Sequence, residues 1–285
     1  HLWLQPDHPD PRRSTLVQLA KALRILTETC GGTLGVFYDF CSVYHGEGLP
    51  YQEALFRKAL SLQSDLFVHP HTWVLKVPTL PRGYPRGFVF RAGSKPNVAP
   101  YMERGWAFCE SRIASLIKAH TSQVLTLGRL PHAIDAYASK KKVGMLDDDE
   151  KFTSWGLCDL ETLIEHCKCP RPPPLTPYQF NVQLEDKCFT SRGRDAPVVR
   201  ALYRRACLSM QSAVSLDFSE LDWGDNEAAQ LAKMIGNGWA RDCRRLFLGQ
   251  NKIGTDGLAA IADGLRQAKT LWLESIDLRG NPGGQ

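Results

Sequence analysis

The stretch Leu246-Phe-Leu-Gly-Gln-Asn-Lys-Ile-Gly-Thr-Asp-Gly257 decides the fold of the C-terminal part of the chain, because its apolar positions recur at a fixed interval. The recurring strand-like residues, 30 positions apart, are Leu216, Leu246 and Ile276, followed two positions later by Phe218, Leu248 and Leu278. The residues between them match at the same interval without a gap: Trp223-Gly224 with Ile253-Gly254, Ala229 with Ala259, Leu231 with Ile261, Ala232 with Ala262, and Ile235 with Leu265. An ordinary globular segment is not expected to match at so many positions, so the sequence predicts a repeated structural unit.

Each unit is predicted to be a short Leu-x-Leu strand, a turn that contains Asn251 or Asn281, and an amphipathic helix. This pattern resembles a leucine-rich repeat of the ribonuclease-inhibitor kind, which implies a short α/β solenoid that binds a protein partner. A single unit cannot bury its apolar face without neighbours. We therefore expect the helix predicted over Pro197–Met210 to cap the array, and the two units and partial third to be the start of a longer solenoid.

Composition limits the classes of function. The chain has 285 residues, and chains of this length usually form about two domains. Its formal net charge is +5. Its basic residues are scattered, which does not favour a nucleic-acid partner. No apolar run approaches the roughly 18 residues that span a bilayer, so no membrane association is expected. Nine cysteines, an odd number, favour reduced thiols and a cytoplasmic location.

The N-terminal region alternates predicted helices and strands. Helices are predicted from Ser14 to the Gly31-Gly32 pair, over Tyr51–Phe67 and over Gly105–Lys118, and strands over Leu34–Phe40 and Thr72–Val77. This alternation predicts an α/β fold with an open parallel sheet and flanking helices. A long Pro-, Gly- and Arg-rich segment over 78–100 interrupts the pattern, and loops of that length are usually functional or disordered.

One motif suggests a family. In Arg104-Gly-Trp-Ala-Phe-Cys-Glu110, Trp106 and Glu110 are four residues apart and share a helix face. The predicted order of elements is similar to the order in Toll/interleukin-1 receptor (TIR) domains. It consists of a strand over 35–40, a loop, a helix, a strand over 73–77 and then Trp-x-x-x-Glu at a helix start. The resemblance covers roughly residues 1–130 and implies a TIR/flavodoxin-like sheet that lacks its first strand.

The same resemblance implies candidate site residues. In TIR domains that cleave NAD, a glutamate at the Trp-x-x-x-Glu position is catalytic, so Glu110, with Trp106 beside it, would stabilise the ribose as the nicotinamide bond breaks. Asp39 follows a predicted strand, where such sheets bind ligands, and Trp3 and Arg104 are the other candidate ligand-binding residues. The alternative is structural, because a helix dipole alone favours a glutamate near a helix start.

Other polar groups are weaker candidates. Asp65 is an acid near a predicted helix end, and Cys41 and His45 are a thiol and an imidazole in one loop with no geometric guarantee of meeting. The segment His166-Cys-Lys-Cys169, with Cys158 and Cys188, invites a zinc interpretation. Structural zinc sites need Cys-x(2–4)-Cys pairs, so we predict free thiols and no metal site.

The predicted organisation is a TIR-like domain over 1–135, a connecting region over 136–196 with a linker of five prolines at 170–177, and a helical cap with repeats over 197–285. Both ends look cut, so a fragment of a longer polypeptide is expected. The favoured function is an intracellular signalling or scaffold protein, with possible self-association and no required cofactor. The alternative is a TIR-type NAD glycohydrolase, for which NAD is the substrate.

Overall fold

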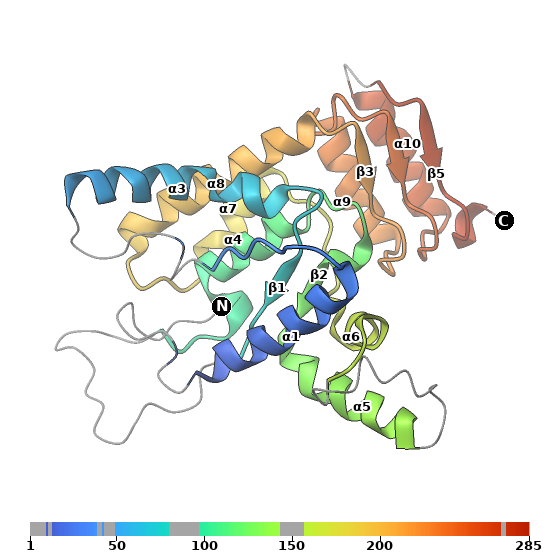
Figure 1. Ribbon diagram of the computed structural model, residues 1–285. Coiled ribbons are helices and arrows are strands. Elements are labelled where there is room, and N and C mark those ends of the chain that lie inside the picture. The colour runs from blue at the N-terminus through green and yellow to red at the C-terminus, as the bar shows by residue number, and fades with distance from the viewer. Residues whose placement is uncertain are drawn as a thin grey trace. The chain divides into compact units, whose positions relative to one another are not determined.

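The computed structural model of the chain describes residues 10, 13–38, 42, 49–79, 97–142, 157–268 and 272–284. Helices dominate these residues, and their short strands form a two-stranded sheet (β1, β2) and a three-stranded parallel sheet (β3, β4, β5) (Figure 1). The described chain is therefore broadly α/β, as the alternation of elements predicts. None of its helices is long and apolar enough to cross a membrane.

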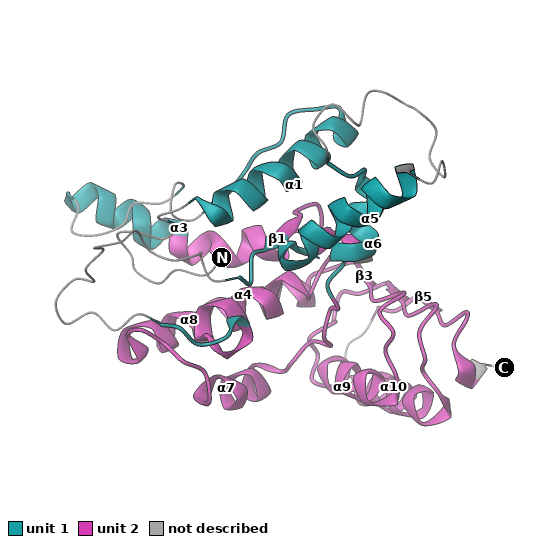
Figure 2. Ribbon diagram, turned by 90° about the horizontal axis from the view of Figure 1, so that it is seen from below, with its two compact units in different colours: residues 1–59, 75–101, 125–169 teal, residues 60–74, 102–124, 170–285 magenta. Residues whose placement is uncertain are grey.

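The chain divides into two compact units that interleave along the sequence (Figure 2). Unit 1 comprises residues 1–59, 75–101 and 125–169, and unit 2 comprises residues 60–74, 102–124 and 170–285. Neither unit begins or ends at the boundaries predicted at residues 135 and 196. Composition marks where a chain becomes polar or Pro-rich, whereas the units depend on contacts between segments that are distant in sequence.

Unit 1 is built mainly from helices. They are α1 (Ser14–Cys30), the first part of α3 (Pro50–Val68), the 3-10 turn η3 (Leu127–Arg129), α5 (Leu130–Lys142) and α6 (Leu160–Cys167). α1 buries Ala22, Ile25 and Leu26 and contacts α6, which also packs against α5. Gly31 ends α1 as predicted, since its φ of 61° is left-handed and its N–H donates to the carbonyl of Thr27.

The strand predicted over Leu34–Phe40 is wrong for the part that the structure describes. Residues 34–38 form no strand, and Val36 and Phe37 are exposed. A short apolar run does not by itself determine a secondary structure, because periodicity cannot identify it. In the described N-terminal region the sheet consists of β1 (Val74–Lys76), within the strand predicted over 72–77, and β2 (Val124–Thr126). The full TIR-type sheet stays a prediction.

Unit 2 begins with a helical layer. It contains the second part of α3, most of η1 (Tyr101–Glu103), α4 (Gly105–Ala114), η2 (Thr121–Gln123), α7 (Pro177–Glu185) and α8 (Arg192–Gln211). α4 and α7 both pack against α8. A row of aromatic rings joins the three helices: Phe180 lies 5.2 Å from Phe108 and 3.9 Å from Tyr203, measured between ring centroids. The helix predicted over Pro197–Met210 is confirmed within α8, whereas the helix predicted over 105–118 ends at Ala114.

The proline-rich segment at 170–177 is packed rather than exposed. Arg171 and Leu175 are buried, and the Tyr203 hydroxyl donates to the Leu175 carbonyl at 2.8 Å. Thr176 caps α7, whose first residue is Pro177. Proline stiffens an extended chain, so the same composition suits a packed strap as well as a linker. This segment belongs to unit 2 and begins where the chain passes from unit 1, which ends at Cys169, into unit 2.

The 30-residue interval appears directly in the second sheet. Strands β3 (Ser215–Asp217), β4 (Arg245–Phe247) and β5 (Ser275–Asp277) are parallel and pair in register at 30-residue steps. After β3 and β4 come α9 (Asp225–Gly236) and α10 (Thr255–Gln267), which lie on one side of the sheet (Figure 2); β5 leads into η5 (Pro282–Gly284).

α9 and α10 approach closely at Gly264. A Cβ atom there would lie 2.6 Å from the backbone oxygen of Ala232. The small residue at this position is therefore required by the packing of the two helices.

The predicted asparagine turns are structural. Asn251 is buried, its Oδ1 accepts from the N–H groups of Leu221 and Trp223, and its Nδ2 donates to the carbonyls of Phe218 and Leu248. The segments that follow β3 and β4 are therefore each bonded by an asparagine side chain of the next repeat, Asn251 or Asn281, which locks neighbouring repeats together.

Candidate functional site

The sheet of unit 2 has one face away from α9 and α10, and its residues form a regular grid. Side chains alternate along a strand, so Leu216 and Leu246 point inward and are buried. The residues directly before and after each of these leucines in the strand point outward. By the strand register, one row of the grid contains Ser215, Arg245 and Ser275, and the next contains Asp217, Phe247 and Asp277.

Arg245 and Phe247 are the large side chains at the centre of this grid. Both are on the middle strand, β4, and Arg245 makes no ion pair with any described residue. The backbone that presents them is held in place, since the N–H of Phe218 donates to the carbonyl of Phe247 and the N–H of Leu248 donates to the carbonyl of Asp277. A rigid sheet thus presents an arginine and an aromatic ring side by side.

The last strand ends in an internal clamp. Arg279 donates from Nε to Oδ1 of Asp277 at 3.0 Å and from a terminal nitrogen to Oδ2 at 2.8 Å. The backbone N–H of Arg279 also donates to Oδ1. Hydrogen bonds from the Arg279 side chain and backbone hold the pKa of Asp277 at about 2. Asp277 is therefore a carboxylate whose charge is already compensated.

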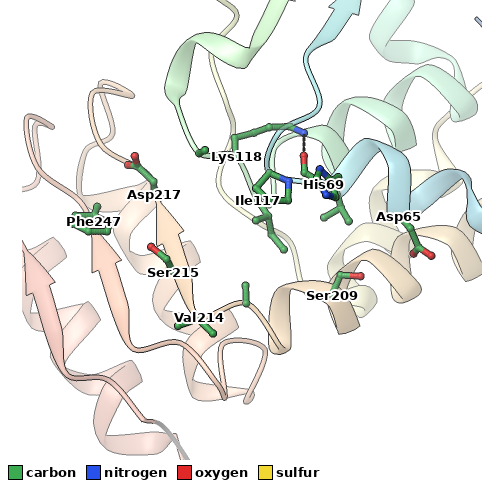
Figure 3. A pocket seen from close by; sticks show the side chains of 13 residues that line it. Asp65, His69, Ile117, Lys118, Ser209, Val214, Ser215, Asp217 and Phe247 are labelled. Atoms are coloured by element: carbon green, nitrogen blue, oxygen red, sulfur yellow. Dashed lines mark hydrogen bonds between the residues drawn. The ribbon is translucent and has the colours of Figure 1, made fainter. Parts of the chain in front are cut away.

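A cavity of about 610 Å³ adjoins the grid at β3 (Figure 3). Its walls come from the end of α3, residues 117–119, the end of α8, and strands β3 and β4. We call it the β3 cavity. Most of its lining is apolar, and Phe247 closes it on the side of the sheet. Val214, at its margin, is 51% exposed.

A second hollow lies on the other side of Phe247. Its volume is about 540 Å³, and it is lined by Phe247 together with residues 275–279. We call it the β5 hollow. Because Phe247 lines both spaces, the hollows and the grid form one continuous surface within unit 2.

Two buried cations lie beside the β3 cavity. The Nζ of Lys118 donates to the backbone carbonyls of Phe67 at 2.8 Å and His69 at 2.9 Å (Figure 3). Burial, and secondarily the charge of Arg171, lowers the pKa of Lys118 to about 7. Arg171 is 1% exposed and donates to the carbonyls of Ser115 at 3.1 Å and Asp217 at 2.9 Å. Both cations are thus ligated by carbonyl oxygens rather than by side-chain carboxylates.

Among the described residues that the sequence analysis singles out, Asp65, noted there only as an acid near a helix end, lines the β3 cavity. Its carboxylate binds Arg205 of α8 through two hydrogen bonds, from Nε at 2.9 Å and from a terminal nitrogen at 2.6 Å. Trp3 and Asp39 lie outside the described residues, as do Cys41 and His45. Their predicted roles stay predictions.

Glu110 lies in α4, away from both hollows. Its Oε1 accepts from Nε2 of Gln63 at 3.1 Å, and Glu110 lines neither the β3 cavity nor the β5 hollow. Trp106 is half-buried against the core, and Arg104 is buried at the start of α4, where desolvation lowers its pKa. The structure therefore places Arg104 and Trp106 at the start of α4 and Glu110 in the middle of the same helix, and gives Glu110 a hydrogen-bond partner in Gln63.

The cysteines form no metal site within the described residues. Burial raises the pKa of the Cys158 and Cys167 thiols to about 11, so both are poor ligands as thiols. Cys169 accepts a contact from Nζ of Lys76 at 3.6 Å, and Cys188 is exposed at the surface of unit 2.

Sequence reasoning missed both Phe247 and Lys118 as surface or cavity residues. A signal existed for Phe247, since it occupies the x position of Leu246-Phe-Leu248, which faces outward in a half-buried strand. No signal existed for Lys118, because its carbonyl partners are about 50 positions earlier in the chain.

Comparison with known proteins adds no family: no family model, curated protein or solved structure matches this chain.

Proposed function

We propose that this chain is a protein-binding scaffold or signalling protein whose leucine-rich-repeat-like units hold a partner on the outward face of the β3–β4–β5 sheet. The carrying observation is the strand register, which sets Arg245 and Phe247 at the centre of a rigid face with a hollow on each side. This function requires binding of the partner and no catalytic step.

The composition of the face supports binding. Binding energy at interfaces is concentrated in a few central residues, among which aromatic residues and arginine are enriched. Phe247 can bury its ring against a partner, and Arg245 can donate several hydrogen bonds to a carboxylate or carbonyl. Arg279 and Asp277 form a pair already satisfied within the chain, which suits a polar rim.

The proposed function also includes a role for the N-terminal region, which the sequence predicts. In it, the TIR-like N-terminal region mediates association with other molecules, and the protein acts in the cytoplasm. The repeats then select the partner, while the N-terminal region assembles the complex.

The experiment compares partner capture by three immobilised full-length proteins. They are the wild type, the double variant Arg245→Ala/Phe247→Ala, and the control Arg266→Ala, an exposed residue of α10 on the helical side. Bound proteins from a cell extract are quantified by mass spectrometry, and circular dichroism confirms that each variant is folded. We expect proteins retained by the wild type and the control to be lost with the double variant. An identical set for all three would refute the proposed surface.

A further inference from the structure

We infer that the partner segment docked at this surface carries a large apolar side chain next to a carboxylate, with the apolar group in the β3 cavity and the carboxylate directed at Lys118. This inference rests on the proposed function and names the chemistry of its partner. It comes from the shape, lining and charges of the β3 cavity, all within unit 2.

The lining of the β3 cavity selects an apolar group. Its lining includes five apolar side chains, those of Val68, Pro70, Ile117, Val214 and Phe247. A polar group that lay against these five side chains would lose water without gaining a hydrogen bond from them. An aliphatic or aromatic side chain would instead be removed from water on both sides. The cavity of about 610 Å³ is large enough for such a side chain.

The charges around the cavity select an anionic neighbour for that group. Asp65 is already compensated by Arg205, with two hydrogen bonds in a bidentate arrangement. Asp217 is the other carboxylate in the lining, and its charge is opposed by the buried Arg171. Lys118 then remains, ligated only by backbone carbonyls. Burial lowers its pKa to about 7, so a partner carboxylate placed beside it would favour its protonated form and be attracted to it.

A basic partner does not fit the same charges. An incoming lysine or arginine would meet Lys118 in a poorly solvated space, where like charges repel strongly, and the nearby charge of the buried Arg171 adds to this repulsion. Asp65 could receive it only by releasing Arg205, which would break both of their hydrogen bonds. Exposed Arg245, at the centre of the neighbouring strand, adds further positive charge to the approach.

The test begins with selection of phage-displayed random peptides on the immobilised full-length chain. We expect the enriched sequences to share an aspartate or glutamate within two positions of Leu, Ile, Met, Phe or Trp. One such peptide is then synthesised in two forms, with the acidic residue and with its amide, and both are titrated by calorimetry. The acidic form should bind at least about tenfold more tightly, as expected when one member of a desolvated charge pair is removed.

Two variants locate the binding. In Lys118→Met the acidic and amide peptides should bind equally, whereas the matched control Lys233→Met, on the exposed side of α9, should keep the preference. Val214→Trp fills the margin of the cavity from an exposed position and should weaken both peptides. This second variant keeps the test decisive if Lys118→Met fails to fold, since its substitution leaves the buried hydrogen bonds intact.

The outcomes separate this inference from the proposed function. Peptides without an acidic preference that nevertheless lose binding in Phe247→Ala would overturn the inference and leave the binding face in place. A basic consensus, or an acidic preference that persists in Lys118→Met, would overturn it as well. Peptides whose binding is unaffected by both Phe247→Ala and Val214→Trp would overturn the inference and count against the sheet face itself.

Discussion

Replacing Asn251 with alanine should be among the most damaging single changes in the repeats. Oδ1 accepts from the N–H groups of Leu221 at 2.9 Å and Trp223 at 3.1 Å, and Nδ2 donates to the carbonyls of Phe218 at 2.8 Å and Leu248 at 2.9 Å. Each such bond contributes about 0.5–1.5 kcal/mol net, so loss of these four should lower the free energy of unfolding by about 2–6 kcal/mol. The side chain is 5% exposed, so water cannot readily replace it.

Urea unfolding followed by circular dichroism and tryptophan fluorescence measures this effect, with Trp223 as a reporter inside unit 2. Asn281 makes three comparable bonds, to Ile253, Leu248 and Leu278, so Asn281→Ala should cost less than Asn251→Ala. The exposed Asn237 donates once, to a carbonyl of its own helix, and Asn237→Ala is the control. If Asn251→Ala lowered the free energy of unfolding no more than Asn237→Ala does, the buried hydrogen bonds of Asn251 would not be what joins neighbouring repeats.

Three further predictions concern packing, charge and catalysis. Gly264→Ala should destabilise the chain by about 1–3 kcal/mol in urea unfolding, because its Cβ would overlap the backbone of Ala232. The control Gly193→Ala, with open space around it in α8, should stabilise the chain by about 0.5–1 kcal/mol. Equal effects of the two substitutions would contradict the close approach of α9 and α10 at Gly264. Burial holds the pKa of Lys118 at about 7, below its ordinary 10.5, so the unfolded chain binds more protons between these pH values. The free energy of unfolding should therefore rise from about pH 7 to about pH 10 more steeply in the wild type than in Lys118→Met, and parallel curves would refute this. A protein-binding function predicts no release of nicotinamide when the chain is incubated with NAD; release that disappears in Glu110→Ala would establish the glycohydrolase instead.

The repeats could be predicted because their information is local and periodic. Leu216, Leu246 and Ile276 recur at one interval, and the same interval fixes which residues pair across the sheet. From that register the outward position of Phe247 follows without further knowledge. The role of Asn251 as a turn residue was visible for the same reason, although its hydrogen bonds to the preceding unit were not.

The cavity and parts of the N-terminal region could not be predicted, because their determinants are not local. Lys118 is buried by carbonyls from the end of α3, and Glu110 is bonded to Gln63 of the same helix, far earlier in the chain. An apolar run such as residues 34–38 has no periodicity that separates a strand from an irregular segment. The proline segment at 170–177 had the composition of a linker, but its contacts decide that it is packed.

The position of Asp225 has a consequence for the order in which the repeats assemble. This residue is in the first turn of α9, yet its Oδ1 accepts from the N–H groups of Gly254 at 2.6 Å and Gly257 at 3.0 Å, at the start of α10. α10 has no side-chain cap from its own N-cap residue, Gly254. Its first turn is therefore completed only once α9 is in place, and α9 leaves the ribosome first. The array should grow in one direction, with each helix serving as the template that nucleates its successor.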